Sequence, residues 1–359
     1  MNRLLPLLYI LPLLFTLSGC VSQQIAKRVL LAPSKQPGVF QNEYTEGFKA
    51  LSRREGSSFH VVDVPVGKDG ESIQTLIIPP RNYSLMAENT YTTEETRKGD
   101  TVTIEIETSM SFQYEDGKKN KEPFLKPKGT IYVLHGYGGN KELLLPLGLI
   151  IAEAGYQTVL VDLRGHGESS GNQIGFGLKE VQDLNEVRRY IHENHEGFEQ
   201  VGVLGYSYGS VMAIQWAAQD PRVQSVVAMA PYNHPEKVMR SFIRSAIKGI
   251  GKTTIDESVQ IVENRLGTNW DNLAMETFVA TATQPMLFIR GEADRMSTQS
   301  VIDQLSDQAN GKRSSLRIDH ADHDSLAFWF NEIRDPILNW FEETYSGSYY
   351  LQNLCLASF

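Results

Sequence analysis

The stretch that decides the fold is V-G-V-L-G-Y-S-Y-G, residues 201–209. An apolar run ends there in the pattern Gly-x-Ser-x-Gly, and residues 210–219 have the composition of a helix. A serine in a sharp turn between a strand and a helix is pushed outward, where a substrate carbonyl can reach it. The turn strains this residue into a positive φ and leaves room only for glycine at the flanking positions, here Gly205 and Gly209. The stretch therefore predicts a nucleophile elbow with Ser207 at its tip.

The chain around this stretch alternates apolar, strand-like runs with helical ones. We expect strands over residues 130–134, 158–161, 201–204, 223–229, 286–289 and 316–318, and helices over residues 143–154, 178–192, 210–218, 298–308 and 325–345. This alternation predicts an α/β fold, with a mostly parallel sheet covered by helices on both faces. Residues 232–283 break the alternation with two or three amphipathic helices and no clear strand. We expect this insertion to cover the site as a lid.

The chain before residue 129 has a different pattern. Two β-like runs, 59–66 and 72–78, flank a turn containing G-K-D-G and predict a hairpin. Residues 82–100 are polar and are expected to form a loop, whereas residues 101–108 alternate polar and apolar side chains as a half-exposed strand does. We expect the chain to divide into a signal peptide over residues 1–19, a membrane tether and lead-in over 20–57, an α/β domain over 58–345 and a tail over 346–359.

A glycine-rich run, H-G-Y-G-G at residues 135–139, follows the strand predicted over residues 130–134. Glycines at the end of a strand allow backbone N–H groups to face the substrate. Acyl transfer needs such donors because negative charge develops on the carbonyl oxygen. We expect the backbone N–H groups of Tyr137 and Tyr208 to form the oxyanion hole.

Two residues beyond the last predicted strands are candidates for an acid and a base. Asp294, in R-G-E-A-D-R-M, can hold a histidine through its Nδ1–H. His323, in D-H-A-D-H-D-S-L, can take the proton of Ser207 and then give it to the leaving group. Glu292 and His320 are the alternatives, but both are expected to lie too close to the strand ends.

A third loop, D-L-R-G-H-G-E-S at residues 162–169, follows the strand predicted over residues 158–161. Its histidine, His166, precedes the serine in the chain and lies between two glycines. We expect a tight turn here, and a structural rather than catalytic role for His166.

The order Ser207, Asp294, His323, together with the motifs H-G-Y-G-G, D-L-R-G-H-G-E-S and G-Y-S-Y-G, resembles the α/β-hydrolase superfamily. It is most similar to the branch of monoacylglycerol-lipase-like and serine-aminopeptidase-like hydrolases. The resemblance covers roughly residues 59–345. It implies an eight-stranded, mostly parallel sheet, a lid after the sixth strand and a Ser-His-Asp triad. The long region before residue 129 departs from the family pattern.

These residues favour a serine hydrolase that cleaves small-molecule or lipid-like carboxylic esters through an acyl-enzyme. A serine peptidase or amidase of the same fold is the alternative, and a non-catalytic, lipid-anchored scaffold is a second. The sequence has neither H-E-x-x-H nor a G-x-G-x-x-G after a strand, so we expect no metal and no cofactor. A net charge of -9 without a basic stripe argues against nucleic acid as a partner. The oligomeric state stays open.

The first twenty residues have the features of an export signal. Arg3 precedes an apolar run over residues 4–17, which is too short to span a membrane comfortably. The ending L-S-G-C resembles the lipobox of bacterial lipoproteins, which implies lipid on Cys20. Val21 after the cysteine is typical of lipoproteins sorted to the outer membrane of Gram-negative bacteria. An ordinary cleaved signal or an uncleaved anchor is the alternative. We therefore expect a lipid-anchored protein of the bacterial cell envelope, facing the periplasm.

The chain contains one other cysteine, Cys355, in its apolar tail. With Cys20 acylated it has no partner in the chain, so we expect no disulfide framework.

Overall fold

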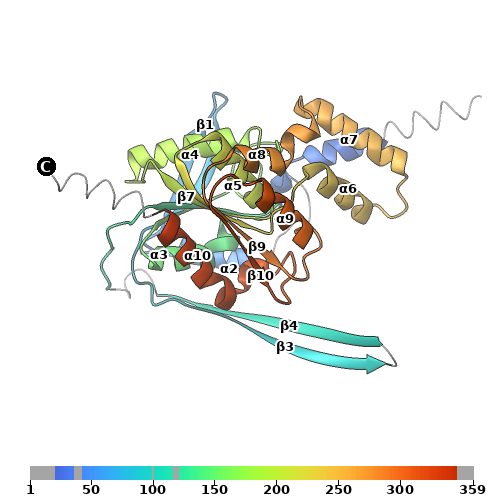
Figure 1. Ribbon diagram of the computed structural model, residues 1–359. Helices are drawn as coiled ribbons and strands as arrows, with labels where there is room; N and C mark the ends of the chain where they lie inside the picture. Colours follow the sequence, from blue (N-terminus) through green and yellow to red (C-terminus); the bar gives the residue numbers. More distant parts are fainter. Residues whose placement is uncertain (1–20, 36–42, 99–100, 116–120, 346–359) are drawn as a thin grey trace, which may run out of the picture.

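The computed structural model describes residues 21–35, 43–98, 101–115 and 121–345. Its centre is an eight-stranded sheet in the order β1-β2-β6-β5-β7-β8-β9-β10 (Figure 1). The first two strands run antiparallel to their neighbours, and all the other pairs are parallel. The strands are β1 (His60–Val66), β2 (Glu71–Ile78), β5 (Thr130–Leu134), β6 (Gln157–Val161), β7 (Val201–Tyr206), β8 (Val223–Met229), β9 (Met286–Gly291) and β10 (Arg313–Ile318). The mostly parallel sheet and the hairpin before it are thus confirmed.

Helices cover both faces of this sheet, as predicted. One face packs against α4 (Glu180–Asn194), α5 (Tyr208–Gln219) and α9 (Gln299–Gln308). The other packs against α2 (Glu43–Ser52), α3 (Leu145–Glu153) and α10 (Phe330–Thr344). Every residue of β5, β6 and β7 is buried as a result. A strand that is buried on both faces consists mostly of apolar residues. This explains the apolar runs of these three strands in the sequence.

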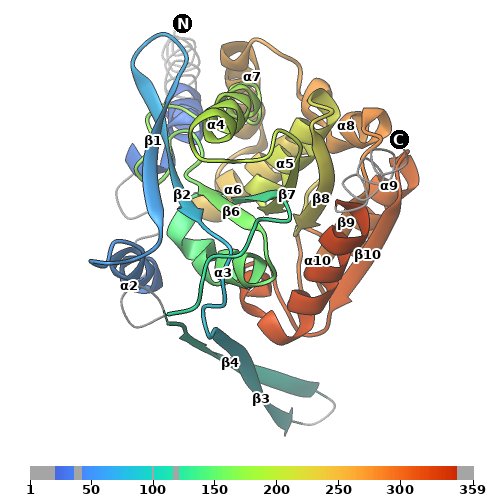
Figure 2. The same cartoon turned by 90° about the vertical axis from the view of Figure 1, so that its left-hand side faces the viewer.

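The prediction of a loop over residues 82–100 is wrong. Strands β3 (Met86–Lys98) and β4 (Thr101–Gln113) pair antiparallel along their whole length and form a separate two-stranded sheet. This hairpin projects from the body of the protein (Figures 1 and 2). Its base is fixed by Asn331 of α10, which donates from its backbone N–H and its side chain to Asn89 at 3.0 and 2.9 Å. The polar side chains suggested a loop, but Thr-rich runs favour strands once a partner strand is present.

The insertion follows β8, the sixth strand of the main sheet along the chain. It contains α6 (Pro235–Ala246), α7 (Lys252–Leu266), the short 3₁₀ helix η4 (Trp270–Leu273) and α8 (Met275–Thr281). The insertion shares a core with the sheet, since Ile243, Val262 and Trp270 are all buried. Its position and helical content are as expected, and its action as a lid stays a prediction.

Residues 21–30 form a helix that packs against the body of the protein, although we expected residues 20–57 to be a tether and lead-in. Ile25, Ala26 and Leu30 are buried in the same core as α5 and the insertion. The Ser22 hydroxyl donates to the Glu257 carboxylate of α7 at 2.7 Å. No helix of the described residues is long and apolar enough to cross a membrane. The predicted signal peptide and Cys355 lie outside the described residues.

Packing of the N-terminal helix can be tested at Leu30, which is 1% exposed. We expect Leu30→Ala to lower the free energy of unfolding by about 2–5 kcal/mol, because it removes buried methyl groups and leaves a cavity. Lys27→Ala, on the exposed side of the same helix, should change it by less than about 0.5 kcal/mol. Urea unfolding followed by tryptophan fluorescence measures both. Equal effects would mean that this helix does not pack on the body.

Candidate active site

Ser207 lies at the tip of the turn between β7 and α5. Its φ of 51° and ψ of -113° are strained for a residue with a side chain, as expected for a nucleophile elbow. The backbone N–H of Ser207 donates to the carbonyl of Met229 at the end of β8, at 2.9 Å. A Cβ at Gly205 would overlap the backbone of Gly209, and a Cβ at Gly209 would overlap the carbonyl of Leu134. The two glycines therefore allow the first turn of α5 to lie directly on the end of β5.

The structure brings the three predicted residues together in one hydrogen-bonded chain. The Ser207 Oγ lies 2.8 Å from His323 Nε2. The other ring nitrogen, Nδ1, lies 2.8 Å from Asp294 Oδ2. Both ring nitrogens are thus engaged, and a proton can pass from the serine hydroxyl to Nε2 while Nδ1–H stays bonded to the carboxylate.

Asp294 is held so that its carboxylate stays charged. Its second oxygen, Oδ1, accepts the backbone N–H groups of Met296 and Ser297, each at 2.8 Å. Burial by itself would raise the pKa of Asp294. The hydrogen bond and charge of His323 and the two backbone donors outweigh it, so the pKa lies below its ordinary value. An ionised carboxylate beside Nδ1 favours the positive imidazolium that forms when the base takes a proton.

His323 is fixed from its other side by Tyr206, the last residue of β7. The Tyr206 hydroxyl donates to the backbone carbonyl of His323. The two rings stack with centroids 6.1 Å apart and planes 28° apart. The strand that carries the serine therefore also positions the histidine.

The alternative acid and base, Glu292 and His320, are hydrogen-bonded to each other. The Glu292 carboxylate accepts the backbone N–H of His320 at 3.2 Å, and both side chains are exposed. Glu292 also faces Arg317 across 3.7 Å.

His166 is fully buried beside His135, with ring centroids 5.0 Å apart. His135 accepts the backbone N–H of Leu163 on Nε2 at 3.1 Å and contacts the Gly136 carbonyl through Nδ1 at 2.8 Å. Burial and the neighbouring His166 lower the pKa of His135 to about 3. Both histidines lie behind the site and hold the loops after β5 and β6 together.

The backbone of the glycine-rich run lies against the serine. A Cβ added at Gly136 would be 3.3 Å from the Ser207 Cβ, so the next residue, Tyr137, follows at the same edge of the site. Tyr208 is the first residue of α5, where the backbone N–H groups of a helix have no partner within the helix. The geometry is compatible with Tyr137 and Tyr208 as the two oxyanion donors.

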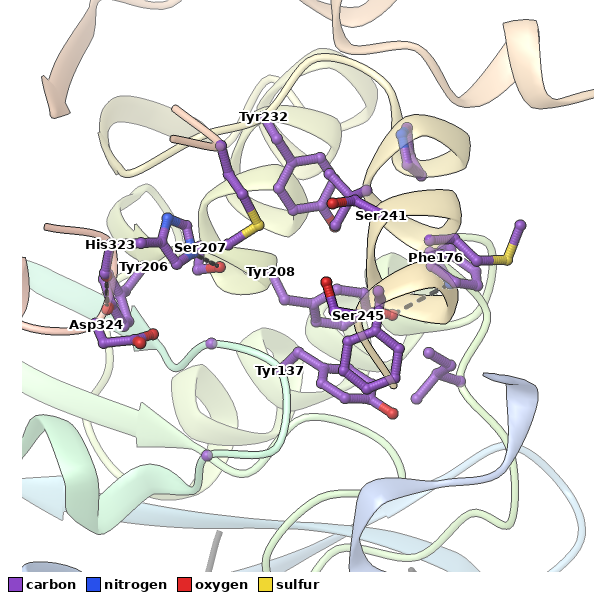
Figure 3. Close-up of a pocket in the computed structure, with 18 of the residues that line it drawn as sticks. Tyr137, Phe176, Tyr206, Ser207, Tyr208, Tyr232, Ser241, Ser245, His323 and Asp324 are labelled. Carbon is purple, nitrogen blue, oxygen red and sulfur yellow. Dashed lines mark hydrogen bonds between the residues drawn. The ribbon is translucent and has the colours of Figure 1, made fainter. Parts of the chain in front are cut away.

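A cavity of about 540 Å³ opens above the serine (Figure 3). Its walls are mostly apolar and aromatic and come from distant parts of the chain: Val29, Tyr137, Ile174, Phe176, Tyr232, Val238, Met239, Phe242 and Phe328. The carboxylate of Asp324, next to His323, also lines it. This volume is within the range of pockets that bind small organic ligands.

Several residues that shape this site have no recognisable signal in the sequence. Glu180, at the start of α4, accepts the Tyr208 hydroxyl at 2.9 Å and the backbone N–H groups of Gly175 and Gly177 at 2.6 and 2.9 Å. It thereby holds Phe176, which has a φ of 53°, against the cavity. A glutamate in the first turn of a helix is so common that its sequence position does not reveal this role.

A buried lysine, Lys141, ties two loops together behind the serine. Its ammonium lies 2.8 Å from Asp162, 3.0 Å from Glu142 and 3.3 Å from Glu168. Asp162 begins the loop after β6 that carries His166, whereas Lys141 follows the glycine-rich run after β5. This pairing fixes the loop after β5 to the loop after β6. Among the residues that the structure describes, no group of histidine, cysteine or acidic side chains could hold a metal ion.

The role of Asp294 predicts a pH-dependent stability. Since its folded-state pKa is lower than the unfolded one, the ionised carboxylate stabilises the fold above about pH 3.9. That contribution to stability is lost as the pH falls through the pKa of Asp294 in the folded state. We expect Asp294→Asn to lower the free energy of unfolding at pH 7 by about 1–3 kcal/mol, and by less near pH 3.

Chemical denaturation at both pH values measures this difference, and the exposed Asp307→Asn on α9 is the control. If Asp294→Asn lowers the free energy of unfolding equally at both pH values, the carboxylate of Asp294 does not stabilise the fold through its charge.

Part of the chain matches a known protein family, and several curated proteins are similar to it in sequence. Residues 125–278 match the family model described as serine aminopeptidase, S33. The chain is 26% identical over 162 residues to a dihydrolipoyllysine-residue acetyltransferase component of the acetoin cleaving system of Cupriavidus necator, covering 44% of this chain and 42% of that protein. It is 23% identical over 247 residues to a carboxylesterase of Bacillus subtilis, covering 67% and 89%. Three curated relatives, the first included, are matched over only 41% to 64% of their own length.

Solved structures show the same fold. An esterase of Pyrococcus furiosus superposes with a TM-score of 0.58 at 14% identity, covering 88% of this chain and 98% of that one. The protein Est1E of Butyrivibrio proteoclasticus, with ferulic acid bound, superposes with a TM-score of 0.51 at 14% identity, covering 78% and 99%. With the partial family match and the mostly parallel eight-stranded sheet, these likenesses show that the chain has the α/β-hydrolase fold.

Proposed function

We propose that this protein hydrolyses carboxylic esters through an acyl-enzyme on Ser207. One observation carries the proposal: a hydrogen-bonded chain runs from Asp294 through His323 to Ser207, and Ser207 lines a mostly apolar cavity. A relative named as a carboxylesterase and a solved structure named as an esterase support it.

The proposed reaction has two halves. His323 Nε2 takes the proton of Ser207 as Oγ attacks the ester carbonyl, and the backbone N–H groups of Tyr137 and Tyr208 stabilise the oxyanion. His323 then protonates the leaving alcohol. A water molecule, deprotonated by the same nitrogen, attacks the acyl-enzyme and releases the acid, and Ser207 regains its proton. Asp294 keeps the imidazole in the correct tautomer throughout.

The cavity favours an apolar acyl or alcohol group. Its aromatic walls from Phe176, Tyr232 and Phe242 offer area for hydrophobic contact, and few polar groups besides the reacting ones lie near them. A lipophilic ester is therefore the preferred substrate class.

Cleavage of a peptide or amide is the second candidate. It is favoured by the family model, which is described as a serine aminopeptidase, and by Asp324. The Asp324 carboxylate lines the cavity beside the histidine and could bind an ammonium group of a substrate (Figure 3). The two candidates differ in the leaving group that His323 must protonate.

A substrate panel tests both candidates. We expect the purified protein to hydrolyse p-nitrophenyl esters, with a preference among acyl chain lengths, and to hydrolyse aminoacyl-nitroanilides weakly or not at all. Ser207→Ala should lower kcat by a factor on the order of 10⁶, because the nucleophile is removed. Turnover of anilides with no turnover of any ester would reverse the order of the two candidates.

Covalent labelling separates an enzyme from a scaffold. A fluorophosphonate should label the wild-type protein and Ser241→Ala, a variant of another serine in the same cavity, but not Ser207→Ala. If the folded wild-type protein takes no label, the site is not an active serine hydrolase.

We also propose that Cys20 carries lipid and anchors the protein in the cell envelope, at the outer membrane facing the periplasm. The L-S-G-C ending of the apolar run supports this. In a bacterial host, an alkyne-tagged fatty acid should be incorporated into the protein and not into Cys20→Ala. Incorporation into both chains would contradict lipid attachment at Cys20.

A further inference from the structure

Helix α6 exposes an unusual combination of side chains. Phe242 on this helix is 55% exposed, and Ile247, which follows its last residue, is 41% exposed. Large apolar side chains that are open to water on a helix and at its end are typical of a surface that contacts something else.

Cations flank these apolar side chains. Lys237, Arg244 and Lys248 are exposed, and none forms an ion pair with any residue in the described part of the chain. Arg240 differs, because Glu236 and Asp256 neutralise it. From residue 237 to residue 255 the sequence has five cations and no anion, although the whole chain has a net charge of -9. The face is thus a local basic surface on an acidic protein.

The exposed side of α6 forms the rim of the cavity. At 100° per residue, its exposed arc runs from Arg244 and Lys237, through Ser241, to Phe242. Ser241 and Phe242 both line the cavity above Ser207. Whatever covers this arc also covers the entrance to the candidate active site.

The beginning of the described chain lies at the same place. The Ser22 hydroxyl contacts the Thr254 carbonyl at 3.4 Å, in the first turn of α7. The loop over residues 247–251 leads directly into that turn. Val21, which is 49% exposed, therefore begins the described chain next to the insertion. Figure 1 shows the N-terminal helix and α7 at the same end of the molecule as this loop. A membrane anchor attached just before Val21 would hold this face at the bilayer.

We propose that the basic and apolar face of the insertion, formed by Lys237, Phe242, Arg244, Ile247 and Lys248, lies on an anionic lipid bilayer with the cavity entrance toward the lipid. Phe242 and Ile247 enter the boundary between headgroups and acyl chains, and the cations contact lipid phosphates. Amphipathic surface helices bind anionic membranes through this division of side chains. A bilayer fits better than an acidic protein, because the described chain begins on the insertion, directly after the predicted export signal and the proposed lipid attachment site.

An environment-sensitive dye tests the contact in the full-length chain. Cys20→Ser and Cys355→Ser remove the native thiols, and Ile247→Cys places one label on the face. The apolar run over residues 4–17 stays in place in every variant, and co-sedimentation with the vesicles confirms that each one is bound. The dye therefore reports the position of the insertion and not binding of the chain. We expect its emission to shift to the blue, and doxyl-labelled lipids to quench it, on vesicles of phosphatidylcholine and phosphatidylglycerol.

Two controls accompany this measurement. A dye at Arg189→Cys, on α4 away from the insertion, should stay unquenched. Reversal of the three cations to glutamate should remove most of the quenching at position 247. The same change of charge at Arg54, Lys121 and Lys126, which are exposed elsewhere, should leave it unchanged.

Quenching at position 247 that is no stronger than at position 189, or that survives reversal of the cations, would overturn the proposal. In the first case the face does not lie on the bilayer and is open to an acidic protein partner, and in the second case the cations do not hold it there. The measurement needs no turnover, so it stands or fails independently of the proposed esterase activity.

Discussion

The arrangement of the site depends on one close backbone contact, between the first turn of α5 and the end of β5. Gly209 makes it possible, since any side chain there would overlap the carbonyl of Leu134. The contact forces the chain to turn sharply at Ser207, which accepts a positive φ and projects its hydroxyl from the sheet. It also brings Gly136 against the serine, so that Ser207 and the glycine-rich run after β5 are positioned by the same packing. The strain at Ser207 is maintained because the central strands around it are buried on both faces.

The carboxyl edge of a parallel sheet explains how much of the site the sequence predicted. Ser207, Asp294 and His323 each follow a strand, and parallel strands end at one edge, so chain order and strand ends were sufficient to bring them together. The same logic predicted the central sheet. It failed for β3, where a strand partner outside the main sheet overrides the polar composition of the segment. The rule based on strand ends also does not identify Glu180. The role of this residue depends on the loop that it contacts in space.

The walls of the cavity were beyond prediction for a different reason. Val29, Phe176 and Tyr232 come from three segments that are far apart in the chain, and each is an ordinary apolar residue in its own sequence context. No local pattern distinguishes such a residue from one in the core. Only the fold shows that the N-terminal helix, which seemed to be part of a lead-in, supplies one wall. Substrate choice therefore depends on tertiary packing, whereas the chemistry depends on short motifs.

The packing of the N-terminal helix has a consequence for folding. Its Ser22 contacts Thr254 and Glu257, which lie 232 and 235 positions later in the chain. Contacts of such long range form slowly, because a large loop must close before they are gained. The helix is the first described segment to be synthesised, yet its partners come near the end. Its buried face, with Ile25, Ala26 and Leu30, must therefore stay uncovered until most of the chain is present. If the protein is exported as proposed, the apolar face of this helix must be shielded until its own fold can cover it.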